Sequence, residues 1–314
     1  LYSPTFHNLR ARKRRSYGHL HVVNGVRIKR KSRSRRGVLM SVASSFRSGD
    51  EPTRPEDKPT TLATAQMSMK QGLKKFGDDG VAAVGSEMQQ LHDRTVMKPM
   101  HKKELTSEQR GEALAYLMFL KRKRTGQVKG RGCADGRKQR AYTPKEEATS
   151  PTIATESVFL CAVRDALEGR NVGIVDVPGA FMQVDLDGDV PIHVRLTGVM
   201  VERLMEIDNE MYAPYVVYEG GEKVLYVELL KALYGTLKAA RLFWEKLSGK
   251  LLEWGFEPNP YDSCVVNKMI NGKQCTVGWH VDDLRISHVD SKVVDHIVDL
   301  MSGEFGKEAP LTIN

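Results

Sequence analysis

The sequence predicts an α+β fold in which helices and antiparallel strand pairs are mixed. In several stretches apolar residues recur at three- and four-residue steps, which is typical of helices. Between them lie short β-branched runs joined by Gly-Gly or Asn-Gly pairs, which is typical of hairpins. The 314 residues contain no visible internal repeat. We therefore expect one large or two ordinary domains.

The composition is that of a globular protein, with 40% hydrophobic residues. No apolar run reaches the roughly 18 to 20 residues that a membrane-spanning helix needs, and the N-terminus lacks the apolar core of a secretory signal. We therefore expect an intracellular protein without a membrane partner. The cysteines form no CxxC pair, which argues against a zinc knuckle or a disulfide framework; they are Cys133, Cys161, Cys264 and Cys275.

The positive charge is concentrated at the N-terminus. Residues 1–60 hold 15 Lys/Arg and 4 Asp/Glu, a local charge of +11, whereas residues 61–314 carry −2. The runs "RARKRRSYGHL" and "RIKRKSRSRRG" have few large apolar residues, so they predict a disordered basic leader over residues 1–64. Such a leader could bind nucleic acid, direct nuclear import, or be a solvated linker.

Residues 65–170 begin with two predicted helices. "ATAQMSMKQGLKKFGDDG" and "VAAVGSEMQQLHDRTVMKPM" have helical spacing, with breaks expected at Gly77, Gly80 and Pro99. "ALAYLMFL" fits a helix or a strand, and the basic, Gly-rich turn after it favours a strand in a hairpin. "PTIATESVFLCAVRDALEGRN" predicts a helix with Thr155 as its N-cap and an end near Gly169. Its apolar side is formed by Val158, Leu160, Cys161, Val163 and Leu167.

The rest of the chain alternates strands and one further helix. Residues 172–177 predict a buried strand that Pro178-Gly179 interrupts, and "PIHVRL" and "PYVVYEGGEKVLYVEL" predict short strands. "GTLKAARLFWEKLSGKLLEWGF" predicts an amphipathic helix with a glycine cap. Asn271-Gly272 predicts a hairpin that joins "SCVVNKMI" to "CTVGWH", and Val281-Asp282-Asp283 predicts a second turn.

Asp282 and Asp283 are the most informative pair of residues. Two adjacent carboxylates at a tight turn repel each other unless a cation lies beside them. Asp176 leaves another apolar strand just before the Pro-Gly break and is a candidate third ligand. Oxygen-only ligation by a few side chains suits Mg²⁺ or Mn²⁺. The alternative is a solvated surface turn, with Asp176 as a cap of the segment that follows it.

Three motifs taken in order indicate a function more specifically than the aspartates alone. "VGIVDVPGAFM", "LLKALYGTLKAARLFWEKL" and "HVDDL" resemble, in order and spacing, the reverse transcriptase of copia-type LTR retrotransposons. "FLKRKRTGQVKGRGCADG" resembles the fingers segment of that family, and "SPTIATESVFLCAVRDAL" resembles the helix before its first catalytic strand. The resemblance covers about residues 65–300. It implies a right-hand polymerase with a fingers-like region at 65–170 and, at 171–314, an antiparallel palm sheet with packed helices.

The resemblance also implies the catalytic residues. Asp176, Asp282 and Asp283 are then the polymerase carboxylates, and the carbonyl of Val177 completes one Mg²⁺ or Mn²⁺ site. A pair of such ions about 3.5 to 4 Å apart can activate an attacking hydroxyl and stabilise leaving pyrophosphate. Phe181 lies under the incoming sugar, where its ring would exclude a ribose 2′-hydroxyl; on the residues alone it could equally be a core aromatic.

The remaining site residues are implied in the same way. Backbone amides of Gly179 and Ala180 would hold triphosphate oxygens. Lys129 and Arg131 occupy the positions of the basic pair of the fingers, although the residues alone also fit a solvated basic turn. The chain departs from the family at two positions, Lys238 instead of glutamine and His280 instead of tyrosine, and we expect both near template or primer.

The implied reaction is the RNA-templated, and secondarily DNA-templated, addition of deoxynucleotides to a primer 3′-hydroxyl. The implied partners are an RNA template, a DNA or RNA primer, dNTPs, and the integrase and RNase H domains of a Pol polyprotein, in a cytoplasmic particle or the nucleus. The sequence stops before the expected primer grip, thumb and RNase H, so we expect poor activity from this chain alone. Two alternatives stay open, an inactive retroelement fragment that only binds nucleic acid and a two-metal nuclease.

Overall fold

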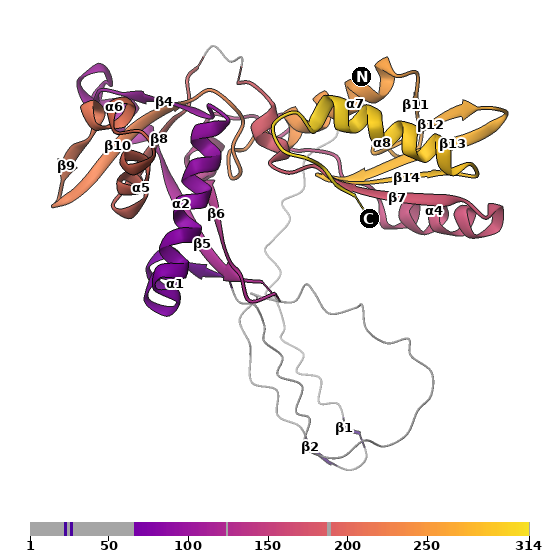
Figure 1. Cartoon of the computed structure of the whole chain (residues 1–314), viewed down its shortest axis with the longest axis horizontal. Coiled ribbons are helices and arrows are strands. Elements are labelled where there is room, and N and C mark those ends of the chain that lie inside the picture. Colours follow the sequence, from indigo (N-terminus) through magenta and orange to yellow (C-terminus); the bar gives the residue numbers. More distant parts are fainter. Residues whose placement is uncertain (1–21, 24–25, 28–65, 124, 187–189, 314) are drawn as a thin grey trace, which may run out of the picture. The chain divides into compact units, whose positions relative to one another are not determined.

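A computed structural model describes residues 22–23, 26–27, 66–123, 125–186 and 190–313 (Figure 1). The chain divides into two units, residues 1–60 and 61–314. In the first unit, β1 (Val22–Val23) and β2 (Val26–Arg27) form an antiparallel pair. The rest of the leader expected over residues 1–64 lies outside the described residues.

The first sheet of residues 61–314 has seven strands. Its central path is β3-β5-β8-β10-β4, with β6 paired to β5 and β9 paired to β10. Only β5 and β8 run parallel, over two residue pairs. The strands are β3 (Met67–Ser68), β4 (Met97–Met100), β5 (Leu114–Arg122), β6 (Val128–Ala134), β8 (His193–Thr197), β9 (Val217–Glu219) and β10 (Glu222–Leu229). The β5–β6 hairpin confirms that "ALAYLMFL" is a strand.

Helices pack against this sheet and enclose a core of its buried side chains, among them Met88, Leu120 and Leu204. The helices are α1 (Met69–Phe76), α2 (Asp78–Asp93), α3 (Ser107–Glu112), α5 (Val199–Ile207) and α6 (Asn209–Tyr212), with the 3₁₀ turns η1 (Lys102–Glu104), η2 (Gly136–Ala141) and η4 (Ala213–Tyr215). The predicted break at Gly77 is confirmed, but the break at Gly80 is wrong. Gly80 is buried inside α2, where an added Cβ would lie 3.4 Å from Leu120, so its small size serves packing.

The second sheet has six strands, all antiparallel, in the order β11-β12-β13-β14-β7-β15. They are β7 (Asn171–Asp176), β11 (Glu257–Pro258), β12 (Val265–Ile270), β13 (Lys273–His280), β14 (Asp283–His288) and β15 (Thr312–Ile313). The mixture of helices and antiparallel sheets confirms the α+β prediction.

Helices cover both faces of the second sheet (Figure 1). Leu284 and Ile286 are buried against residues of α7 (Ala239–Glu253) and α8 (Ser291–Phe305). Arg285 lies between them on β14 and therefore points to the opposite face, where it pairs with Asp165 of α4 (Thr155–Glu168). None of the helices in the described part of the chain is long and apolar enough to span a membrane.

The turns agree with the hairpin signals. Asn271 and Gly272 both have positive φ, 52° and 72°, as a two-residue primed turn requires. The second predicted turn is shorter than expected, because Asp283 already pairs with His280 across β13 and β14 and leaves a loop of Val281 and Asp282.

The chain passes between the two sheets more than once. After β7 in the second sheet, residues 193–229 add the strands β8, β9 and β10 to the first sheet. The helices α5 and α6 lie in the same segment of the chain. The boundary that we expected between residues 170 and 171 therefore does not separate the two sheets. The reason is non-local strand pairing: β8 and β10 pair with strands far away in the sequence, which local patterns do not encode.

Candidate active site

A pocket of about 250 Å³ is lined by residues of α2, β6, the end of β7, the β13–β14 turn and the segment before α7. Asp176 and Asp282 lie on one side of its lining in the second sheet, and Lys129 and Arg131 come from the first sheet. The pocket therefore brings together two of the predicted carboxylates and both predicted basic residues.

Backbone pairing fixes the carboxylates. Asp176 is the last residue of β7 and lies opposite Asp283, the first residue of β14. The N–H of Val177 donates to the carbonyl of Asp282 at 3.0 Å, which ties the end of β7 to the hairpin turn. Residues more than a hundred positions apart are thus held by the sheet register, as the metal-site hypothesis requires.

The carboxylates influence one another. Burial raises the pKa of Asp176, and the negative charges of Asp282 and Asp283 raise it further, whereas the charge of Lys129 lowers it. This is the like-charge repulsion that the adjacent aspartates predict. A cation at this edge of the sheet would relieve it.

The turn that carries Asp282 is strained. Val281 has a φ of 59°, a conformation that is unfavourable for a β-branched residue. Such strain persists only where surrounding structure enforces it, here the ladder of five residue pairs between β13 and β14. The ladder therefore holds Asp282 at the tip of the hairpin in spite of the strain at Val281.

The Pro178-Gly179 turn begins two residues after Asp176. Gly179 lines the pocket with a φ of 63°, and a Cβ there would lie 2.8 Å from the guanidinium of Arg94. Arg94 is buried, donates to the carbonyl of Pro178 at 3.2 Å and pairs with Glu308 at 2.9 Å. Arg94 therefore supports the turn from behind. The N–H group of Gly179, which precedes η3 (Ala180–Gln183), donates to no described residue, and Gly179 lines the pocket, whereas Ala180 is fully buried and does not line it.

The sequence "KGRG" explains how the two basic residues reach the pocket. Gly130 and Gly132 are buried: a Cβ on Gly130 would lie 2.6 Å from the carbonyl oxygen of Ala83, and one on Gly132 would overlap the hydroxyl of Tyr116. Lys129 and Arg131 alternate with these glycines and are exposed on the other face of β6. Neither forms an ion pair within the described part of the chain.

Tyr234 is a pocket residue that the sequence reasoning missed. The N–H of Ala134, at the end of β6, donates to the carbonyl of Tyr234 at 2.7 Å. Gly235 has a φ of 91°, and a Cβ there would lie 2.0 Å from the carbonyl oxygen of Ala134, so only glycine permits this contact. The Tyr-Gly pair inside "LLKALYGTLKAARLFWEKL" was the available signal.

The ring of Tyr234 lies between two predicted site residues. Its centroid is 4.4 Å from that of Phe181, and the guanidinium of Arg131 lies 5.7 Å from it. Burial, followed by the charge of Asp282, raises the pKa of Tyr234 to about 12. Its hydroxyl therefore stays protonated near neutral pH and can donate a hydrogen bond inside the pocket.

A family model described as reverse transcriptase (RNA-dependent DNA polymerase) matches residues 103–309, which is more than half of the chain. The chain belongs to the reverse transcriptase family. No curated protein matches the sequence. The matched region of this reverse transcriptase includes Lys129, Arg131, Asp176, Tyr234 and both aspartates of the hairpin.

The side chains of Asp176, Asp282 and Asp283 do not converge on one point. Among the residues that the structure describes, no three His, Cys, Asp or Glu side chains are close enough to hold a metal ion. Asp176 and Asp282 line the pocket, whereas Asp283 lines a neighbouring pocket with His280 and Arg285. Carboxylate oxygens suit a hard divalent cation in chemistry, and Asp176 and Asp282 are the two predicted carboxylates that line the pocket.

Four other predicted residues lie outside the pocket lining, and one of them, Ala180, is fully buried. Phe181 is buried, with Tyr234 on one side and Phe243 at 6.3 Å on the other. Lys238 precedes α7 and pairs with Glu147. His280 is exposed at the end of β13, on the side of the sheet that faces α4.

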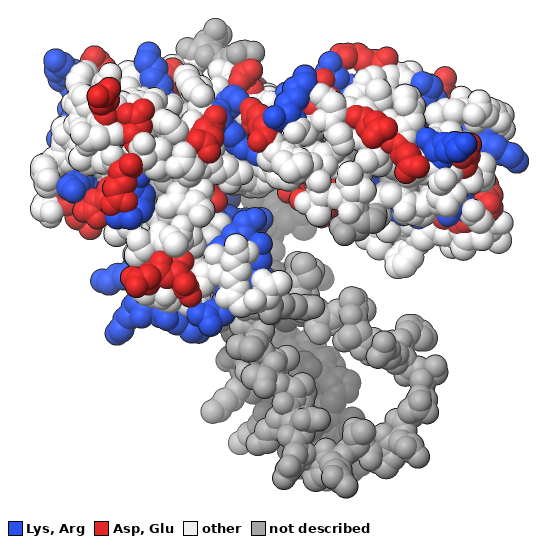
Figure 2. Space-filling model, viewed as in Figure 1, with Lys and Arg blue, Asp and Glu red and all other residues white. Residues whose placement is uncertain are grey.

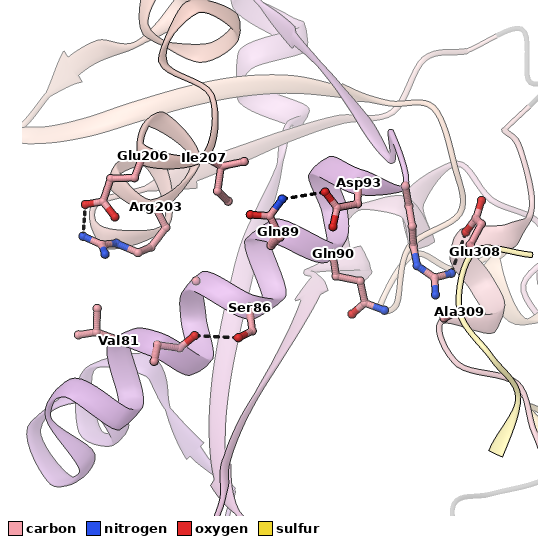
Figure 3. A pocket seen from close by; sticks show the side chains of 13 residues that line it. Val81, Ser86, Gln89, Gln90, Asp93, Arg203, Glu206, Ile207, Glu308 and Ala309 are labelled. Carbon is pink, nitrogen blue, oxygen red and sulfur yellow. Dashed lines mark hydrogen bonds and ion pairs between the residues drawn. The ribbon is translucent and has the colours of Figure 1, made fainter.

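A larger cavity of about 830 Å³ lies between α2 and α5 (Figure 3). Its charged side chains are already paired with near neighbours, since Arg203 pairs with Glu206 and Gln89 donates to Asp93 at 2.7 Å. It contains no cluster of carboxylates facing free basic residues. The smaller pocket is therefore the candidate active site.

Proposed function

We propose that this chain is the polymerase region of a copia-type reverse transcriptase, with the fingers and palm of a right-hand polymerase. It adds dNTPs to a primer 3′-hydroxyl on an RNA template and, secondarily, on a DNA template. The observation that carries the proposal is the pocket in which Asp176 and Asp282 lie opposite Lys129 and Arg131.

In this proposal Asp176, Asp282 and Asp283, with the carbonyl of Val177, hold Mg²⁺ or Mn²⁺. The bound ions would lower the pKa of the primer hydroxyl and stabilise the leaving pyrophosphate. The protein contributes the position of its carboxylates, which the β7–β14 register and the strained Val281 turn hold at one edge of the sheet.

The triphosphate is bound by the opposite side of the pocket. Lys129 and Arg131 supply positive charge that no described carboxylate pairs with, and charge-assisted bonds to phosphate are strong. The N–H group of Gly179 adds a neutral donor in the pocket lining, at the turn after Asp176.

The sugar would lie near Tyr234, which stacks on Phe181. Phe181 then favours deoxynucleotides by supporting the ring that meets the 2′-position, rather than by direct exposure. Lys238 and His280 lie further away and contact template or primer in this proposal.

The proposed partners are an RNA template, a DNA or RNA primer, dNTPs, and the integrase and RNase H domains of the same Pol polyprotein, in a cytoplasmic particle or the nucleus, without a membrane. The distribution of charge supports a nucleic-acid partner. Figure 2 shows Lys and Arg gathered over α1 and the end of the β5–β6 hairpin, where Lys74, Lys75, Lys121 and Arg122 lie.

Primer extension tests the proposal. The full chain, with and without a separately supplied downstream segment, is incubated with an RNA template, a DNA primer, dNTPs and Mg²⁺ or Mn²⁺. Asp282→Asn should reduce extension about 100-fold or more, because it removes a charge from the reacting centre. Asp299→Asn, on the exposed side of α8, is the control and should extend like the wild type.

Each outcome of this assay has a distinct meaning. No extension by the wild type in either form contradicts the polymerase, and binding of the primer-template without extension favours an inactive nucleic-acid-binding fragment. Extension that Asp282→Asn does not change contradicts the site. Cleavage of labelled substrate in the absence of dNTPs favours the two-metal nuclease.

A further inference from the structure

Glu87 is an acidic residue inside the pocket lining that the proposed reaction does not use. It lies on α2, is half-buried, and lines the pocket together with Lys129, Arg131 and Asp176. Its carboxylate accepts a hydrogen bond from the N–H of Gly132 at 2.8 Å. A carboxylate in a pocket proposed to bind a triphosphate needs an explanation, because the two anions repel each other.

The packing of α2 on β6 brings Glu87 to this position. β6 pairs with β5 through one edge only, and its other edge faces α2. Gly130 allows the backbone of α2 to approach, since any Cβ there would clash with the carbonyl of Ala83. Glu87, one helical turn after Ala83, then reaches the free N–H of Gly132 and satisfies a donor at the strand edge.

The charges around Glu87 are mostly basic. Burial raises the pKa of Glu87, whereas the hydrogen bond from Gly132 and then the charges of Lys129 and Arg131 lower it. The other groups that face it are Asp176 across the pocket, Tyr234, and Tyr116 on β5, whose hydroxyl has no described hydrogen-bond partner. Lys129 also acts on Asp176, so it lies between two carboxylates.

We propose that Glu87 is a positioning residue of the nucleotide pocket: its bond to Gly132 fixes β6. Its negative charge attracts Lys129 and Arg131 toward the empty pocket without an ion pair, until a triphosphate takes its place as their counter-charge. The inference rests on the proposed nucleotide site. Two properties of Glu87 are separable in this arrangement, because its acceptor oxygen positions the strand whereas its charge competes with the incoming anion.

A binding experiment separates the effect of the acceptor oxygen from that of the charge. Calorimetric titration measures the binding of non-hydrolysable α,β-methylene dATP to the full chain with Mg²⁺. Glu87→Gln keeps an acceptor for Gly132 and removes the charge, so it should lower the Kd about 5-fold at low salt, with a smaller gain at high salt. Glu87→Ala removes both, so its Kd should exceed that of Glu87→Gln by about 3-fold or more.

Glu257→Gln, on the exposed strand β11, is the matched control for the change in total charge and should bind like the wild type. A gain in affinity is a result that a merely structural role of Glu87 does not give. An equal or higher Kd for Glu87→Gln, with a circular dichroism spectrum like that of the wild type, overturns the inference and leaves the proposed function intact. No binding by the wild type overturns the nucleotide site and, with it, this inference.

Discussion

At the scale of single residues, the candidate site contains residues whose local interactions or backbone conformations are unfavourable. Asp176 is held next to two other carboxylates, and Val281 is held at positive φ. Such conflicts between local preference and the fold are expected at functional sites, where a ligand relieves them. A divalent cation is the ligand that we propose for these carboxylates.

Asp176→Asn should stabilise the metal-free protein near neutral pH. The pKa of Asp176 is higher in the folded state than its ordinary value of 3.8, so the folded state binds the proton more tightly than the unfolded state. Wild-type stability therefore falls as pH rises through the folded pKa, and the variant does not show this loss. Thermal unfolding should give a higher Tm for the variant at pH 7, and the difference should disappear below about pH 3.8.

The same residue gives a metal test. Added Mg²⁺ should raise the Tm of the wild type, because it binds only the folded site, and should raise that of Asp176→Asn less. Asp299→Asn should follow the wild type at each pH and Mg²⁺ concentration. A lower Tm for metal-free Asp176→Asn at pH 7 would contradict the repulsion.

At the scale of elements, the strand β6 is the part of the site whose sequence is most fully explained. Its glycines face α2 and Tyr116, and its basic residues face the pocket. Alternation in a strand makes these two requirements compatible within four consecutive residues.

Gly130→Ala should cost about 1 to 3 kcal/mol, because its Cβ would lie 2.6 Å from a backbone oxygen that cannot move without shifting α2. Denaturant unfolding measures this change. Gly249→Ala, inside α7 with no atom near the added Cβ, is the matched control and should stabilise by about 0.5 to 1 kcal/mol. Equal effects of the two substitutions would contradict the close approach of α2.

α4 shows where periodicity predicts an element but not its environment. The helix is confirmed over Thr155–Glu168, yet the apolar side expected from its spacing is exposed in the described chain: Leu160 is 70% and Leu167 81% exposed. Leu167→Lys should therefore change the free energy of unfolding by less than about 0.5 kcal/mol. Leu204→Ala, fully buried on α5, should cost about 2 to 5 kcal/mol in the same measurement.

At the scale of the whole molecule, a few contacts connect the ends of elements that are distant in sequence. Arg94, after α2, joins the carbonyl of Pro178 to Glu308, which follows α8. The Ala134–Tyr234 bond connects the end of β6 to the segment before α7. These contacts hold the basic strand and the acidic hairpin around one pocket.

Arg94→Met should cost about 1 to 3 kcal/mol, because Arg94 is buried and Glu308 keeps only its contact with Lys231. Arg164→Met, which breaks an exposed pair with Glu168 on α4, should change the free energy of unfolding by less than about 0.5 kcal/mol. Denaturant unfolding compares the two. Similar small changes would show that the buried pair does not connect the elements.

The sequence by itself determined the features that depend on neighbours along the chain. Hairpin turns follow from φ preferences, as at Asn271-Gly272, and strands and helices follow from apolar periodicity. The adjacent aspartates are a local signal of the same kind, since two neighbouring carboxylates at a turn repel each other wherever the turn lies in the fold.

Only the tertiary structure decided which distant residues share the pocket. Glu87 and Arg94 carry no local signal, and Tyr234 is marked only by the glycine after it, because the roles of all three come from contacts with strands and turns more than forty positions away. Non-local pairing also placed residues 193–229 in the first sheet and left Asp283 outside the pocket lining. Sequence patterns report the energy of neighbouring residues, whereas a site is formed by burial and charge between elements that meet only in the folded chain.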